Sequence, residues 1–340
     1  MRDVLPTLER WADEGLKVAI ATVVERLGSA PRDAGASLAV NERGEIAGSV
    51  TGGCVEPSVI REAHEVLAGG PARLCRYGIA DDDAFEVGLS CGGTVAILVH
   101  ALDTTLVGAL AAAVAADRPV AFAVGLGETI GEQRLVAEGD EDERAVRALL
   151  EVADNGVVET DDELVFVESF APRPALYVFG AVDHASALVT AGRFLGYRVT
   201  VCDARATFVT PERFPDADEL VVEWPDRFLA RAPVDARTAI CVLTHDTKFD
   251  VPALKAALAT PAGYIGAMGS AKTTIEREDR LRAEGVTEGD IARIHAPIGI
   301  RIGARTPEEV AIAVVAQLIE STSAARKRPA AGVARATVIS

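Results

Sequence analysis

The sequence predicts an α/β protein in which an N-terminal α+β domain with cysteines precedes a Rossmann-like domain with a doubly wound parallel sheet. At 340 residues the chain is too long for one ordinary core, so two domains are expected. In the second half, apolar strand-like runs alternate with helical patterns, which is typical of a parallel sheet. In the first half, two short apolar runs flank a polar turn that ends at Gly44, the pattern of a hairpin.

Residues 171–174, Ala-Pro-Arg-Pro, interrupt all periodicity and mark the expected domain boundary. We therefore expect an N-terminal domain over residues 1–170 and a C-terminal Rossmann-like domain over residues 174–322. The small residues and basic run of residues 323–340 predict a disordered tail.

Composition excludes several classes of function. A formal net charge of -17 argues against nucleic acid or an anionic membrane surface as the main partner. Five widely spaced cysteines, an odd number, indicate a reducing compartment rather than a disulfide framework. The N-terminal residues 1–16 predict an amphipathic helix without a signal core, and the apolar stretch 106–116 is too short to span a bilayer. These features predict a cytoplasmic protein with no membrane span.

The first domain begins, after its helix, with a continuous apolar run at residues 17–24, typical of a buried strand. A loop rich in turn residues follows at 28–35 and carries Arg32. This side chain is a candidate for gripping a phosphate or carboxylate, and a solvated loop arginine is the alternative. The remaining elements expected in this domain are the hairpin 36–47, a helix through 59–67, strands at 74–79 and 95–99, and a helix at 106–116.

The stretch from Gly48 to Pro57, which includes Glu56, predicts a strand end, a glycine turn and the first turn of a helix. Gly52, Gly53 and Cys54 would then lie where backbone N–H groups and the helix dipole favour an anion. A thiol at that place is expected to be reactive, because its thiolate is the anion being favoured. The alternative is a tight turn with a buried, inert cysteine.

A second cysteine beside paired glycines, Cys91-Gly92-Gly93, precedes the strand 95–99 and mirrors the first turn. The two loops predict one shared site, with Cys54 and Cys91 as candidate metal ligands, although the sequence has no zinc spacing. The other three cysteines lie in apolar strand-like runs and are expected in cores; they are Cys75, Cys202 and Cys241.

The second domain opens with the strand 175–180, a helix at 185–196 and the strand 198–203, the layout of a Rossmann unit. Gly180 ends the first strand, and Asp203 stands about 20 residues further on, where such units place an acid. Val182 replaces the glycine that lets a pyrophosphate approach the backbone, which makes NAD(P) binding doubtful. Further strands are expected at 220–223, 238–244 and 264–266, and helices at 251–259, 273–284 and 307–319, the last with a capping box at Thr306 and Glu309.

Two loops of this domain carry candidate binding residues. Gly269, Ser270 and Lys272 lie between a strand end and a helix start, which suits a phosphate, but Ala271 stands where a Walker loop needs glycine. His245 and Asp246 follow a strand at the edge where open α/β sheets bind ligands. A hydrogen-bonded loop histidine is the alternative.

Taken together, these residues resemble the XdhC/CoxI family of xanthine dehydrogenase accessory factors. The resemblance reaches to about residue 320 and rests on the segments GSAPRDAGASL, GSVTGGCVE, GLSCGGTV, YVFGA, VTVCDAR, LTHD, YIGAMGS and HAPIGIRIGARTPEEVA. The family usually has glycine where Val182 stands, so the chain departs from the family at that position.

The resemblance implies a chaperone more than a catalyst. Family members bind the molybdenum cofactor (molybdopterin) and protect it during sulfuration, together with a cysteine desulfurase. They then deliver it to an apo molybdenum hydroxylase such as xanthine or carbon monoxide dehydrogenase. The residues alone leave open an NAD(P)-linked oxidoreductase, a nucleotide-sensing scaffold for the target enzyme, and association as a homodimer.

Overall fold

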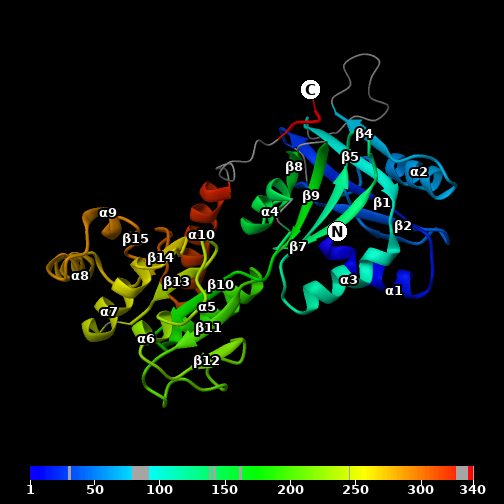
Figure 1. Cartoon of the computed structure of the whole chain (residues 1–340). Helices are drawn as coiled ribbons and strands as arrows, with labels where there is room; N and C mark the ends of the chain where they lie inside the picture. The colour runs from blue at the N-terminus through cyan, green and yellow to red at the C-terminus, as the bar shows by residue number, and fades with distance from the viewer. Residues whose placement is uncertain are drawn as a thin grey trace. The chain divides into compact units, whose positions relative to one another are not determined.

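The computed structural model describes residues 1–29, 32–78, 92–137, 139–140, 143–160, 163–244, 246–326 and 336–339 (Figure 1). The chain divides into two compact units. The N-terminal unit comprises residues 1–172 and 329–340, and the Rossmann unit comprises residues 173–328. No helix among the described residues is long and apolar enough to cross a membrane.

The first sheet of the N-terminal unit is antiparallel throughout, in the order β3-β2-β1-β5-β4. Its strands are β1 (Val18–Leu27), β2 (Ser37–Asn41), β3 (Ile46–Gly48), β4 (Arg73–Tyr77) and β5 (Thr94–Ala101). The expected hairpin is confirmed by the pairing of β2 with β3, and Gly44 closes its turn by donating to the Asn41 carbonyl at 2.9 Å. The apolar run that predicted a buried strand is β1.

A second antiparallel sheet, in the order β7-β6-β9-β8, lies in the same unit. Its strands are β6 (Val120–Gly125), β7 (Gln133–Ala137), β8 (Gly156–Glu159) and β9 (Leu164–Phe170). The helices are η1 (Arg2–Val4), α1 (Leu5–Asp13), α2 (Glu56–Leu67), α3 (Thr104–Ala115) and α4 (Arg144–Glu151). One core joins the two sheets with α1 and α3, while α2 covers the outer face of the first sheet and α4 that of the second.

The Rossmann unit confirms the predicted doubly wound sheet. Its strands are all parallel, in the order β12-β11-β10-β13-β14-β15, which reverses direction beside β10 as a dinucleotide fold does. The strands are β10 (Ala175–Phe179), β11 (Arg198–Cys202), β12 (Glu219–Val221), β13 (Ala239–Val242), β14 (Tyr264–Ala267) and β15 (Ile294–His295).

Helices cover both faces of this sheet, and each face has its own apolar core. The helices are α5 (Asp183–Phe194), α6 (Pro225–Leu229), α7 (Thr247–Leu258), α8 (Ala271–Ala283), α9 (Glu288–Ile291) and α10 (Pro307–Arg326). The predicted capping box is confirmed at the start of α10, where Thr306 Oγ1 accepts from the Glu309 N–H and the Glu309 carboxylate accepts from the Thr306 N–H, both at 3.2 Å.

The structure differs from the expectation of a disordered tail from residue 323. Helix α10 continues to Arg326, and residues 336–339 contact the N-terminal unit. Val338 is buried in the core between the sheets, at 8% exposure. Its burial explains the difference, because an apolar side chain that finds a core offsets the entropy of ordering a short segment.

Candidate functional site

Three loops of the N-terminal unit leave the first sheet at one end. Because the sheet is antiparallel, the pairings Leu27 with Thr94 and Tyr77 with Val95 place the ends of β1 and β4 beside the start of β5. The pairing of Leu38 with Gly48 places the end of β3 beside the start of β2. The loops that carry Arg32, Cys54 and the glycine pair before β5 therefore share this end of the sheet.

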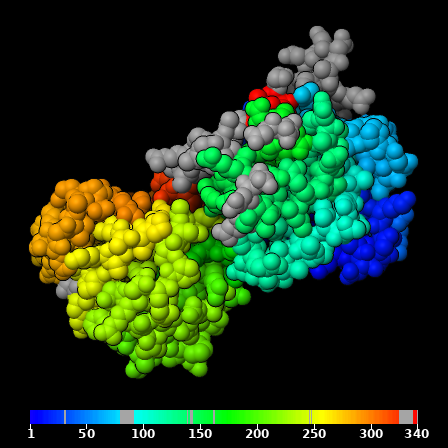
Figure 2. Space-filling model, viewed as in Figure 1, coloured from blue at the N-terminus to red at the C-terminus, as the bar shows by residue number. Residues whose placement is uncertain are grey.

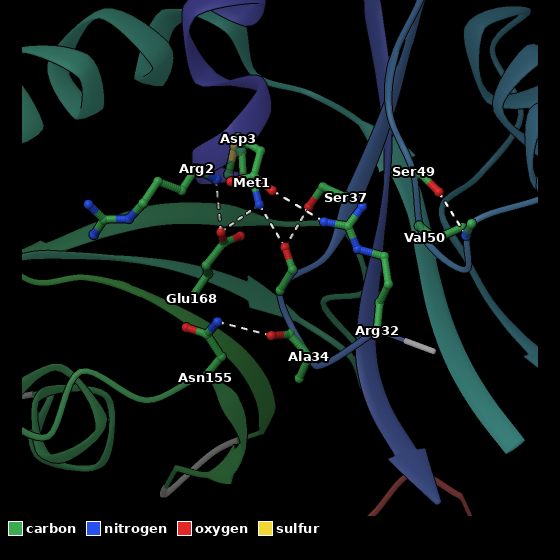
Figure 3. Close-up of polar contacts among 12 residues, drawn as sticks. Met1, Arg2, Asp3, Arg32, Ala34, Ser37, Ser49, Val50, Asn155 and Glu168 are labelled. Atoms are coloured by element: carbon green, nitrogen blue, oxygen red, sulfur yellow. Dashed lines mark hydrogen bonds and ion pairs between the residues drawn. The ribbon is translucent and has the colours of Figure 1, made fainter. Parts of the chain in front are cut away.

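The loop with Arg32 is anchored by residues distant in the sequence (Figure 3). Arg32 Nη2 lies 3.2 Å from the Asp3 carboxylate, and the Asn155 amide donates to the Ala34 carbonyl at 3.0 Å. The amino group of Met1 donates to the Gly35 carbonyl at 2.7 Å. The same amino group forms a buried ion pair with Glu168 at 2.6 Å. Asp3, Asn155 and Glu168 gave no sequence signal, because only the tertiary fold brings them to this loop.

The glycine turn does gather backbone N–H groups around an anion, and that anion is the carboxylate of Glu56. Its oxygens accept from the N–H groups of Thr51, Gly52 and Gly53 at 2.8–2.9 Å. The hydroxyls of Ser49 and Thr51 donate to it at 2.6 and 2.7 Å. Gly52 and Gly53 have φ of 81° and 120°, the left-handed region that this turn requires.

Burial alone would raise the pKa of Glu56, but the hydrogen bonds from Ser49 and Thr51 outweigh it and lower the pKa to about 2. The carboxylate is therefore ionised at neutral pH and holds the turn that precedes Cys54. The Cys54 side chain is half-buried at the start of α2 and packs against the core between this helix and the first sheet. A sequence signal for this role was present: an acid in the first turn of a helix that follows Ser49 and Thr51.

The second glycine pair lies beside the first loop. A Cβ on Gly28 would approach the Gly93 Cα to 3.5 Å, so the backbones of the two loops run close together. Gly92 has φ of 75° and is exposed. Cys91 lies outside the described residues, so its predicted pairing with Cys54 stays a prediction. Among the described residues, no group of three or more metal-ligating side chains lies together.

The cysteines predicted to be core residues are in or against apolar cores. Cys202 and Cys241 have no exposed surface, and Cys75 packs beneath α2. Burial raises the pKa of Cys202 and of Cys241 to about 12, and burial and the charge of Glu62 raise the pKa of Cys75. These thiols stay protonated at neutral pH.

In the Rossmann unit, Gly180 and Asp203 lie at the carboxyl edge of the sheet, and both serve the fold directly. Gly180 has φ of 105°, and a Cβ there would lie 2.7 Å from the Thr244 side chain. Asp203 accepts from the Ala181 N–H at 2.9 Å and from Arg205 Nη2 at 2.7 Å. Burial alone would raise the pKa of Asp203, but these bonds hold it below its ordinary value. Val182 precedes α5 in extended conformation and packs against the core.

The other predicted residues of this edge begin helices. Asp246 caps α7 and forms an ion pair with Lys248 at 3.0 Å, which lowers the pKa of Asp246. Ser270 caps α8, and its hydroxyl accepts from the Thr273 N–H at 3.2 Å. Gly269 directly precedes that cap, and Lys272 projects into solvent with 87% of its side chain exposed. His245 lies outside the described residues.

Sequence analysis missed a buried ion pair behind this edge. Asp250 on α7 and Arg277 on α8 are 1% and 3% exposed, and their charged groups lie 3.0 Å apart. Thr244 donates to the same aspartate, and Arg277 donates to the Met268 carbonyl at 2.6 Å. The pair ties both helix starts to the ends of β13 and β14.

Comparison with known proteins gives matches over most of the chain. A family model described as the XdhC Rossmann domain matches residues 176–318, and one described as the XdhC and CoxI family matches residues 11–78. A Bacillus subtilis protein, named as one probable subunit of a xanthine dehydrogenase, is 26% identical, over 95% of this chain and 97% of that protein. The Escherichia coli molybdenum cofactor insertion chaperone PaoD is 29% identical, over 92% of this chain and 87% of that protein.

Among solved structures, the crystal structure of a xanthine dehydrogenase from Bacillus halodurans superimposes with a TM-score of 0.71 and 26% identity. The match covers 96% of this chain and 97% of that one. Similarity of this extent includes both units and the segments that carry the candidate residues. The chain belongs to the XdhC and CoxI family.

Proposed function

We propose that this protein is a maturation factor that binds the molybdenum cofactor and protects it during sulfuration. It then delivers the cofactor to an apo molybdenum hydroxylase, such as xanthine or carbon monoxide dehydrogenase. The observation that carries this proposal is the similarity to an insertion chaperone for this cofactor over 92% of the chain. A cysteine desulfurase is the proposed source of the sulfur.

The shared end of the first sheet is the proposed contact surface for the cofactor. A pyranopterin with a phosphate or nucleotide tail needs a cation and room beside the backbone. Arg32 supplies the cation, with 37% of its side chain exposed. The exposed Gly52, Gly53 and Gly92 leave the loop backbones without side chains. The N–H groups around Glu56 already have an acceptor, so this turn would contribute the Cys54 thiol rather than an empty anion site.

At the Rossmann unit, the exposed Asp246 and Lys272, with Gly269, are proposed contacts for a phosphate or nucleotide tail. Ser270 and Asp203 already have partners within the chain, so their proposed contribution is to shape the backbone of this edge. NAD(P) stays a competing ligand for the same edge.

The proposal predicts that Cys54→Ala and Cys91→Ala each lower the activity of a molybdenum hydroxylase co-expressed with the variant. If the two thiols act as one unit, the double variant is little worse than the more severe single variant. Cys75→Ala, Cys202→Ala and Cys241→Ala are the matched controls, because their protonated, core-packed thiols serve stability. We expect lower melting temperatures and unchanged cofactor transfer from these controls.

Equilibrium dialysis of the purified protein against molybdenum cofactor and against NAD or NADP tests ligand choice directly. Binding of the pterin in preference to the dinucleotides is the expected result. Tight NAD(P) binding without detectable pterin binding would contradict the chaperone proposal. Hydroxylase activity equal to wild type with folded Cys54→Ala and Cys91→Ala would remove the thiols from it.

A further inference from the structure

The segment Ala336–Ile339, here called the tail segment, lies against the N-terminal unit, where Figure 2 shows its red atoms beside blue and green ones. Hydrogen bonds hold its backbone along its length. The Val338 and Ile339 N–H groups each donate to Glu25 Oε2 at 2.7 Å. The Ala336 N–H donates to the Val157 carbonyl at 3.1 Å.

Two charged side chains of the first sheet form the core of this contact. Glu25 on β1 and Arg76 on β4 both stand opposite Ala96 of β5, so they rise from the same face on either side of the strand between them. Arg76 donates to the Val338 carbonyl through Nη2 at 2.6 Å and Nε at 3.1 Å. The carboxylate and the guanidinium thus satisfy the donor and the acceptor of one backbone residue. Charge-assisted bonds of this kind are stronger than bonds between neutral groups.

Side-chain contacts add selectivity to the backbone contacts. Val338 is 8% exposed and belongs to the core between the two sheets, against which Ala336 and Ile339 also pack. The Thr337 hydroxyl donates to Glu25 Oε1 at 2.6 Å. The pocket therefore fits a small β-branched apolar residue that follows a hydroxyl-bearing one.

We propose that Glu25 and Arg76 form a peptide-recognition site of the N-terminal unit whose ligand is the tail segment of the same chain. The chain leaves this unit after Pro172 and returns to it after α10. The bound tail segment therefore fastens the chain to the N-terminal unit a second time. Tethering gives such a ligand an effective concentration in the millimolar range, so four residues suffice to keep the site filled.

Hydrogen exchange of the full chain, resolved at the Val338 and Ile339 amides, tests the proposal. In the wild type, both amides are expected to exchange at least about tenfold more slowly than in a free peptide of the same sequence. Glu25→Gln and Arg76→Ala are expected to remove most of that protection. Glu9→Gln, at an exposed glutamate of α1, is the matched control and leaves it unchanged.

Two further variants keep the test decisive if a change in the sheet impairs folding. Thr337→Val and Val338→Asp lie in the tail segment itself, so the sheet residues stay intact while the contact is weakened. Exchange at free-peptide rates in the wild type would overturn the proposal. Protection that increases with protein concentration would also overturn it, because the site would then bind the tail of a second copy.

Discussion

At the scale of single residues, Glu56 shows how a sequence pattern can predict the chemistry of a turn and miss its occupant. Glycines before a helix predicted an anion beside free N–H groups, and the structure has that anion. The anion is a side chain of the same turn, which spacing alone does not reveal because its rotamer decides where it points. Glu56 is thereby a positioning residue for the Cys54 turn.

Glu56→Gln is expected to lower the free energy of unfolding by about 2–4 kcal/mol, because an amide turns two donors toward N–H groups that need an acceptor. The pKa of Glu56 is lowered from 4.5 to about 2 in the fold, so its contribution is fully present above pH 4.5 and is lost as the pH falls toward 2. Urea unfolding at pH 7 and at pH 3 measures both effects. Glu9→Gln serves as the exposed control, and an equal loss from both substitutions would contradict the role given to Glu56.

At the scale of secondary-structure elements, prediction succeeded where the pattern is local. The strand-helix alternation of the Rossmann unit, the hairpin of β2 and β3 and the capping box of α10 all follow from apolar period, turn residues and helix caps. The contacts that were missed join elements far apart in sequence. Asn155 reaches the Arg32 loop, and Arg277 on α8 reaches Asp250 on α7; neither residue stands out from its neighbours in the sequence.

The link between α7 and α8 predicts a large effect from one substitution. Arg277→Met is expected to lower the free energy of unfolding by about 3–5 kcal/mol, because it leaves the buried charge of Asp250 without its guanidinium partner. Arg280→Met, an exposed arginine of the same helix, is the matched control and is expected to change stability by about 0.5 kcal/mol or less. Thermal melts of the two variants measure the difference. Similar melting temperatures for both would show that the pair contributes little.

At the scale of the whole molecule, the chain has separate cores in its two units, and each unit has one of the two tryptophans. Trp11 is buried in the N-terminal unit at 1% exposure, and Trp224 packs on Phe249 in the Rossmann unit. Replacing either one by phenylalanine leaves a fluorescence probe specific to the other unit. The chain therefore allows the unfolding of each unit to be followed by itself.

With these probes, we expect the two units to unfold as separate cooperative transitions, because each completes its own core. In the Trp224→Phe background, Glu56→Gln should lower the urea midpoint reported by Trp11, and Arg277→Met should leave it unchanged. In the Trp11→Phe background the two substitutions should exchange roles, since changes that share no contacts act independently. If either substitution shifted both probes equally, the two units would form one cooperative structure, and the free energies measured for single variants would belong to the whole chain.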